Sequence, residues 1–211
     1  MIGAMRRFAL AVCMAALLVA PAAASAASAG SEGLLTTAEY AQLASAQKAL
    51  KSVSTAKATV LVCARTKNVS QLLKAWKRDC NGVADYALTG IRAQAAAKSC
   101  TKYSSTADRM VCMYPTYDAF YRAARAYYRA DQRVDELAQA RGFDSACVAV
   151  IGDPITVVAA EGRLAKNLRQ LVRALYKKDA PALEAAATRA DKDQDQIQSN
   201  APTSLSLCPH R

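Results

Sequence analysis

The stretch YDAFYRAARAYYRADQRVDELAQAR, from Tyr117 to Arg141, decides the fold of this chain. Its apolar residues recur three or four positions apart, which is the spacing of one face of an α-helix. Those residues are Phe120, Ala123, Tyr127, Ala130, Val134 and Leu137. The opposite face carries arginine, glutamine and glutamate at Arg122, Arg125, Arg129, Gln132, Arg133, Glu136 and Gln139. One amphipathic helix cannot bury its apolar face alone, so the stretch predicts a protein built from several packed helices.

Other segments of the chain supply such helices. Thr36 and Glu39 have the spacing of a capping box, and Asp153 followed by Pro154 is a typical helix start. Pro115 should break a helix, and Gly142 should end the one that contains Tyr117–Arg141. Glycine, proline and alternating β-branched residues are too scarce for a sheet. The pattern predicts an all-α fold, an antiparallel bundle of four to five helices stapled by disulfides.

The N-terminus has the three parts of a secretory signal peptide. Arg6 and Arg7 precede an apolar run from residue 8 to residue 20, and Ala24-Ser25-Ala26 fits a cleavage site. The run is shorter than the roughly 20 residues of a membrane span. We therefore predict a signal peptide over 1–26, a flexible N-terminal segment over 27–35 and a single helical bundle domain over 36–211. The mature chain should have no transmembrane span and should be secreted, periplasmic or on the cell surface.

The cysteines support export. Removing the signal peptide leaves an even number of cysteines, which in an exported chain indicates a disulfide framework. An antiparallel hairpin of the last two long helices would bring Cys147 beside Cys208, and a single turn separates Cys100 from Cys112. Cys80 and Cys100 lie roughly 30 Å apart on one predicted helix and cannot pair, which leaves Cys63 for Cys80. The predicted pairs are therefore Cys63–Cys80, Cys100–Cys112 and Cys147–Cys208.

The residues that most enzymes and metal sites need are scarce. The only histidine is His210, next to last in the chain, and no two cysteines have the C-x-x-C spacing of a redox site. A glycine-rich phosphate loop is also missing. The sequence therefore predicts no catalytic residue, no cofactor and no metal ligand, and the protein is not expected to be an enzyme.

Two acids lie on apolar helix faces, where burying a lone carboxylate would be costly. They are Asp131, between Tyr127 and Val134, and Glu161, between Val157 and Leu164. One interpretation is structural, with each acid paired to an arginine or to a tyrosine hydroxyl. The alternative is a pocket between helices, lined by Tyr127, Asp131 and Glu161, that carries a small apolar ligand. Helical bundles that bind two metal ions use Glu-x-x-His motifs, and this chain has none.

Positive charge is concentrated in one part of the chain. The formal charge of +11 falls to +9 once Arg6 and Arg7 are removed. Between Lys48 and Lys102 there are 11 lysines and arginines and only two acids, so this segment alone carries +9. A strongly basic segment often does no more than keep the protein soluble. Five exposed cations are nevertheless candidates for binding: Lys51, Lys74, Lys77, Arg78 and Lys98.

The charge and the export signal together suggest the partners. Nucleic acid is not expected outside the cytoplasm, whereas anionic envelope polymers and the head groups of a membrane surface are available there. The leading hypothesis is an exported, non-enzymatic helical-bundle module that binds such anionic partners through its basic surface. A carrier of a small apolar ligand bound between helices is the alternative.

Overall fold

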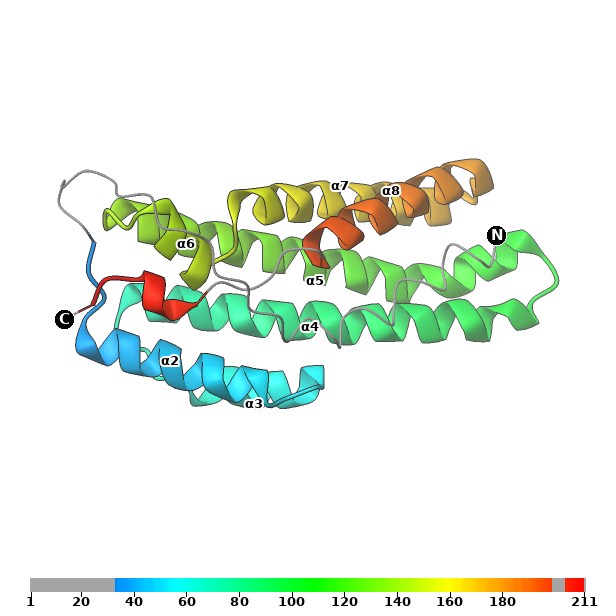
Figure 1. Ribbon diagram of the computed structural model, residues 1–211. Helices are drawn as coiled ribbons and strands as arrows, with labels where there is room; N and C mark the ends of the chain where they lie inside the picture. Colours follow the sequence, from blue (N-terminus) through cyan, green and yellow to red (C-terminus); the bar gives the residue numbers. More distant parts are fainter. Residues whose placement is uncertain (1–32, 199–203, 211) are drawn as a thin grey trace.

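Two long antiparallel helices, α4 and α5, form the axis of the protein (Figure 1). The computed structural model describes residues 33–198 and 204–210, so the predicted signal peptide lies outside the described residues. Helices α2 and α3 lie beside the first half of α4, and α7 and α8 lie on the other side, over α5. The α-helices are α2 (Thr37–Lys51), α3 (Ala56–Arg65), α4 (Gln71–Ser99), α5 (Thr106–Ala140), α6 (Ser145–Ile151), α7 (Ile155–Lys177) and α8 (Ala180–Gln198).

The predicted all-α class is confirmed. Two short 3-10 turns, η1 (Cys100–Lys102) and η2 (Leu205–Leu207), complete the helical elements, and the described residues contain no β-strand. The predicted count of four to five helices is not confirmed, because the described ranges contain seven. The difference comes partly from α6, which has only seven residues and is too short to show a periodic apolar pattern.

The core consists of two hydrophobic clusters, and α5 passes through both. In the first, Phe120 and Tyr127 of α5 pack with residues of α4, α7 and α8. In the second, Val134 and Ala138 of α5 pack with α2, α3, the start of α4, α6 and the C-terminal segment. The apolar face predicted for Tyr117–Arg141 is therefore the common wall of both clusters.

The predicted helix break at Pro115 is wrong. Helix α5 runs without interruption from Thr106 to Ala140 with Pro115 inside it. Proline removes one hydrogen bond to the carbonyl four residues earlier, here that of Val111. Pro115 is exposed and the Val111 side chain is 54% exposed, so water can reach this part of the helix. Buried Met110 and Met113 keep the first turns of α5 on the core.

The two halves of α4 differ in burial. Leu72, Leu73 and Trp76 in the first half are buried, but Ile91 in the second half is 44% exposed. The reason is that α2 and α3 cover only the first half of α4 (Figure 1). Helix α4 continues through Gly82. A Cβ at Gly82 would lie 3.1 Å from the Tyr127 Cα, so glycine lets α5 approach α4 closely at this point.

The three predicted disulfides are confirmed: Cys63–Cys80, Cys100–Cys112 and Cys147–Cys208. Cys63–Cys80 joins α3 to α4, and Cys100–Cys112 closes the turn between α4 and α5. Cys147–Cys208 ties the C-terminal segment to α6 across a sequence separation of 61 residues. All six of these cysteines are therefore paired.

Among the described residues, no single helix is long and apolar enough to cross a membrane. Helices α6 and α7 reach that length and composition only as a pair, bent by 48°. The apolar residues of α7, such as Leu168 and Leu171, are buried in the first hydrophobic cluster.

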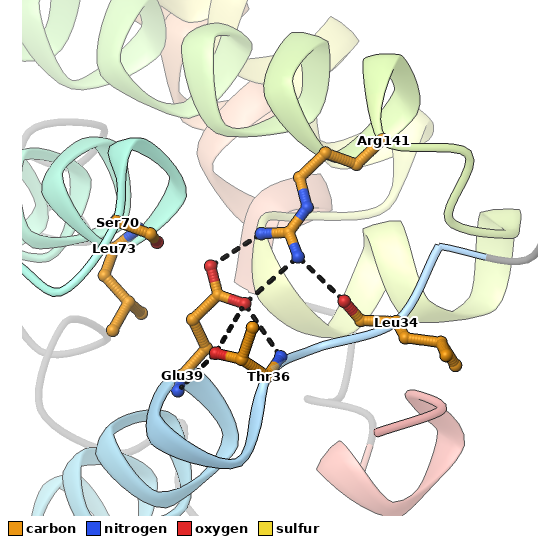
Figure 2. A network of polar contacts seen from close by, with 6 residues as sticks. All are labelled: Leu34, Thr36, Glu39, Ser70, Leu73 and Arg141. Atoms are coloured by element: carbon orange, nitrogen blue, oxygen red, sulfur yellow. Dashed lines mark hydrogen bonds and ion pairs between the residues drawn. The ribbon is translucent and has the colours of Figure 1, made fainter. Parts of the chain in front are cut away.

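A buried ion pair fastens the start of α2 to the end of α5 (Figure 2). Glu39 is 2% exposed, and Arg141 donates to its two carboxylate oxygens at 2.6 and 3.0 Å. Burial alone would raise the pKa of Glu39, but hydrogen bonds from Arg141, Ser70 and Thr36 lower it to about 2. Arg141 also donates to the Leu34 carbonyl at 2.7 Å. The network confirms the predicted capping box and holds Glu39 in its charged form.

Residues 33–35, the end of the segment predicted to be flexible, are anchored in the same region. The Gly33 amide donates to the Gly142 carbonyl and the Leu35 amide to the Pro209 carbonyl, both at 3.0 Å. Leu35 is fully buried. His210 stacks on Tyr40 with ring centroids 3.7 Å apart. These contacts hold both ends of the described chain against α2 and the end of α5.

Thr36→Ala should lower the free energy of unfolding by about 1–2 kcal/mol, because the Glu39 amide loses its cap and the Glu39 carboxylate loses a donor. Thr55→Ala is the matched control. Thr55 caps α3 at an exposed site without a buried acid, so we expect its loss to cost about 0.5–1 kcal/mol. Urea unfolding of both variants measures the difference, and equal losses would show that the Glu39 network adds nothing to the cap.

Candidate functional site

Five acidic side chains gather where the two hydrophobic clusters meet, and we name them the acid cluster. They are Asp79 of α4, Asp131 and Asp135 of α5, Asp153 of the α6–α7 loop, and Glu161 of α7. Carboxylate oxygens of Asp131, Asp153 and Glu161 lie within 4.8 Å of one another. Asp79 and Asp135 act electrostatically on this central group. The cluster therefore brings together acids from α4, from α5 and from the start of α7 with its preceding loop.

Local structure explains how the acids meet. Asp131 and Asp135 are four residues apart on α5, so they project from the same side of the helix. Gly152 lets the α6–α7 loop approach them, because a Cβ there would lie 2.4 Å from Asp135 Oδ1 and 3.2 Å from Asp131 Oδ1. The prediction that Asp153 caps α7 is wrong. Pro154 occupies the N-cap position, and the Asp153 carboxylate turns inward to accept a hydrogen bond from the Tyr127 hydroxyl at 3.0 Å.

Most carboxylate oxygens of the cluster are buried without a hydrogen-bond partner. Asp131 is fully buried, Glu161 is 2% exposed and Asp79 is 8% exposed. Within the described part of the chain, no hydrogen bond of good geometry reaches either oxygen of Asp131 or Glu161, nor one oxygen each of Asp79 and Asp135. Leaving an ionised carboxylate in this state is costly. The cluster therefore needs protons or a cation.

Burial raises the pKa of every acid in the cluster, and the neighbouring acids raise most of them further. The pKa of Asp131 rises to about 8, through burial and then the charges of Asp153 and Asp135. That of Asp135 rises to about 6 through burial and the charge of Asp153. Burial, Asp131 and Asp153 likewise raise the pKa of Glu161, although the Tyr127 hydroxyl opposes the shift. In the described structure, the groups that shift the pKa of these five carboxyls are acids and Tyr127, and none is a lysine or arginine.

The residues of the predicted pocket, Tyr127, Asp131 and Glu161, do come together. A tyrosine hydroxyl is present, as the structural interpretation expected, but it donates to Asp153, which that interpretation did not include. Two surface hollows of about 280 and 500 Å³ lie elsewhere, between α7 and α8, and are lined mainly by polar and charged residues. The Tyr127 ring packs in the first hydrophobic cluster, and its hydroxyl end meets the carboxylates. The groups that converge there suit a cation better than an apolar ligand.

Sequence reasoning missed three members of the cluster, Asp79, Asp135 and Asp153. A signal existed for Asp135, since Tyr127, Asp131 and Asp135 follow one another at four-residue steps along one helix face. Asp79 precedes a buried cysteine, but nothing in its local sequence shows that it turns inward. The motif Asp153-Pro154 hid the role of Asp153, because it matches an ordinary helix start.

The five predicted binding cations do not form one site. Lys51, Lys74, Arg78 and Lys98 are exposed, whereas Lys77 is partly buried and donates to the carbonyls of Ala64 and Thr66 at 2.8 and 3.0 Å. Lys77 therefore caps the C-terminal end of α3. Lys98 follows Arg78 by 20 residues on α4, which places it about 30 Å away. Lys74, Lys77 and Arg78 lie within about one turn of one another on α4, whereas Lys51 is the last residue of α2.

The cations of segment 48–102 lack acidic partners of their own. The ion pairs found among the described residues are Arg122–Asp118, Arg133–Glu136, Arg141–Glu39 and Arg163–Asp193, and none involves this segment. Of its two acids, Asp79 is buried in the acid cluster and Asp85 is exposed. By contrast, the basic face of α7 is partly neutralised by α8, since Arg163 pairs with Asp193 at 2.9 Å.

No protein-family model, curated protein or solved structure matches this chain. The features that bear on its function are therefore the acid cluster, the basic segment and the disulfide-bonded helical fold.

Proposed function

We propose that this protein is an exported, non-enzymatic helical module that binds anionic envelope polymers or lipid head groups through segment 48–102. The observation that supports this most is the absence of ion pairs for that segment among the described residues. Exposed like charges repel one another along the helices unless something anionic screens them. An anionic partner would relieve this repulsion.

The arrangement of the charges favours an extended partner over a small anion. Helix α4 has 29 residues and is about 43 Å long, and its exposed cations reach from Lys74 to Lys98. A phosphate-sized ligand would contact only one or two of them. A polymer or a membrane surface would contact several at once, with about 1 kcal/mol for each cation near an anionic surface.

Two further observations support export and a role without catalysis. The six cysteines outside the predicted signal peptide form three disulfides, which persist in oxidising compartments. The acids that could serve as general acid and base, Asp131 and Glu161, are enclosed in the core, where a macromolecular substrate has no access.

The test is a charge reversal, Lys74→Glu with Arg78→Glu, compared with Arg125→Glu and Arg129→Glu on α5. All four residues are exposed, each pair is four residues apart on one helix, and both double variants change the net charge equally. Lys77 is left in place because it caps the C-terminal end of α3. At low salt, the α4 variant should bind anionic vesicles or a polyanion at least about 30-fold more weakly than the wild type, whereas the α5 variant should lose much less.

Vesicles of anionic lipid, vesicles of zwitterionic lipid and a soluble polyanion, compared by co-sedimentation or column retention, separate the two kinds of partner. Binding should weaken steeply as salt is raised, since the screening length is only about 10 Å at 0.1 M. Equal retention of the two double variants would contradict the proposal and leave the charge with a role in solubility.

A further inference from the structure

We propose that the acid cluster is a binding site for one divalent cation of the oxygen-preferring class, best suited to Ca²⁺, held between Asp131, Asp153 and Glu161. This inference is independent of the basic segment and of the partner proposed for it. It rests on the donor types, their spacing and the state of the buried oxygens.

The donors are all oxygen atoms. Carboxylates and hydroxyls are the ligands of Ca²⁺, Mg²⁺ and Mn²⁺, whereas zinc and copper sites normally include histidine or cysteine. The six described cysteines are in disulfides, and His210 stacks on Tyr40 of α2. In the described chain, soft metal ions therefore have no suitable ligand near the cluster.

The number and spacing of the oxygens suit one ion of this class. One oxygen from each of Asp131, Asp153 and Glu161 lies within 4.8 Å of the other two, so a single ion can reach all three with small side-chain adjustments. Three protein carboxylates suit the adaptable coordination of Ca²⁺, whereas Mg²⁺ usually binds one or two carboxylates and requires a near-ideal octahedron.

The unpartnered oxygens point to a ligand rather than to a self-contained structural pair. Asp131 is fully buried and Glu161 is 2% exposed, and within the described chain no hydrogen bond of good geometry reaches either oxygen of either residue. Tyr127 and Asp153 are close enough to act on these two carboxyls but do not satisfy them. Ligation would occupy one oxygen from each of them and from Asp153. The acids Asp79 and Asp135 would add negative charge around the ion, and the Tyr127 hydroxyl would orient Asp153.

An ion has a route to the cluster through the α6–α7 loop. Gly152, Asp153 and Pro154 are partly exposed, and so is Asp135 on the adjacent turn of α5. The centre of the cluster is therefore enclosed by helices on one side and covered on the other by a short loop.

Protons are the competing occupants of the cluster. The groups that face it are Asp79 and Tyr86 from α4, Tyr127, Asp131 and Asp135 from α5, Asp153 from the loop and Glu161 from α7, and none of them is cationic. A carboxylate binds a metal ion in its ionised form, so the ion must displace any proton that these buried oxygens hold. Affinity for the cation should therefore increase with pH, and binding should release protons.

The experiment uses the disulfide-intact protein, stripped with a chelator and dialysed. CaCl₂, MgCl₂ and MnCl₂ are titrated by calorimetry in two buffers of different ionisation enthalpy, at pH 6 and pH 8, with thermal unfolding in parallel. We expect one Ca²⁺ per chain, an affinity at least tenfold higher at pH 8, proton release and a higher Tm. No binding of any of the three ions up to about 10 mM, above the weakest extracellular calcium affinities, would overturn the proposal.

Two isosteric variants, Asp131→Asn and Glu161→Gln, locate the site. Each should weaken Ca²⁺ binding at least tenfold and abolish the rise in Tm, while Glu184→Gln at an exposed position of α8 should leave both unchanged. Circular dichroism without metal verifies that each variant is folded. Wild-type affinity in folded Asp131→Asn and Glu161→Gln would place the bound ion elsewhere and overturn the assignment. The Lys74→Glu/Arg78→Glu variant should retain Ca²⁺ binding, which separates this inference from the proposed function.

Discussion

Replacing Asp131 with asparagine is expected to stabilise the cation-free protein at pH 7 by about 2–4 kcal/mol, which corresponds to a rise in Tm of roughly 5–15 °C. Burial and the charges of Asp153 and Asp135 raise the pKa of Asp131 from 3.8 to about 8. The wild-type protein must therefore take up a proton at this position when it folds at neutral pH. Asparagine has a similar shape, needs no proton and carries no charge.

The direction of the pH dependence follows from the raised pKa. Between about pH 4 and pH 8, the folded protein binds more protons at Asp131 than the unfolded chain does, so stability falls as the pH rises through this range. The contribution of Asp131 is fully present below the pKa of the unfolded chain and is lost as the pH passes the folded pKa. The Asp131→Asn variant lacks this slope, so its advantage should be small at pH 4 and large at pH 7.

Urea unfolding in the presence of a chelator, at pH 4, 5.5 and 7, measures the effect. Asp195→Asn, an exposed position on α8, is the matched control and should change stability by no more than about 0.5 kcal/mol at any of these pH values. A variant less stable than the wild type at pH 7 would mean that the Asp131 carboxylate is ionised and compensated in the cation-free protein.

Removing the Cys147–Cys208 disulfide should lower the free energy of unfolding by about 4 kcal/mol in the chain-entropy model. The reason is the size of the loop it closes, because the two cysteines are 61 residues apart, against 12 residues for Cys100–Cys112. The same model gives about 3 kcal/mol for the shorter loop. A domain is stable by only about 5–15 kcal/mol, so the first loss is a large fraction of the total.

The double variants Cys147→Ala/Cys208→Ala and Cys100→Ala/Cys112→Ala form a matched pair, since each removes one disulfide. Chemical denaturation of both under non-reducing conditions should show the larger loss for the first. The first variant also releases the C-terminal segment, in which the Pro209 carbonyl accepts a hydrogen bond from the Leu35 amide. Equal losses, or a larger loss for Cys100→Ala/Cys112→Ala, would contradict loop closure as the source of the stabilisation.

Local patterns in the sequence were enough to predict the helical class and the disulfide pairs. Apolar residues three or four apart specify a helix face whatever the rest of the chain does, and a continuous helix restricts which cysteines can meet. The same periodicity placed Asp131 and Glu161 on buried faces, which the structure confirms. The capping box of Thr36 and Glu39 was also visible, because both of its residues lie within one turn.

Tertiary structure decided the features that depend on contacts between distant segments. Ile91 is exposed because α2 and α3 cover only the first half of α4. Lys77 can cap the C-terminal end of α3 because α3 lies beside α4. The acid cluster has the same origin. Each of its carboxylates has unremarkable sequence neighbours, and only the packing of α4, α5, α7 and the α6–α7 loop removes them from water together. The local sequence specified where each helix lies in the chain, but the cost of burying these charges arises only when the helices meet.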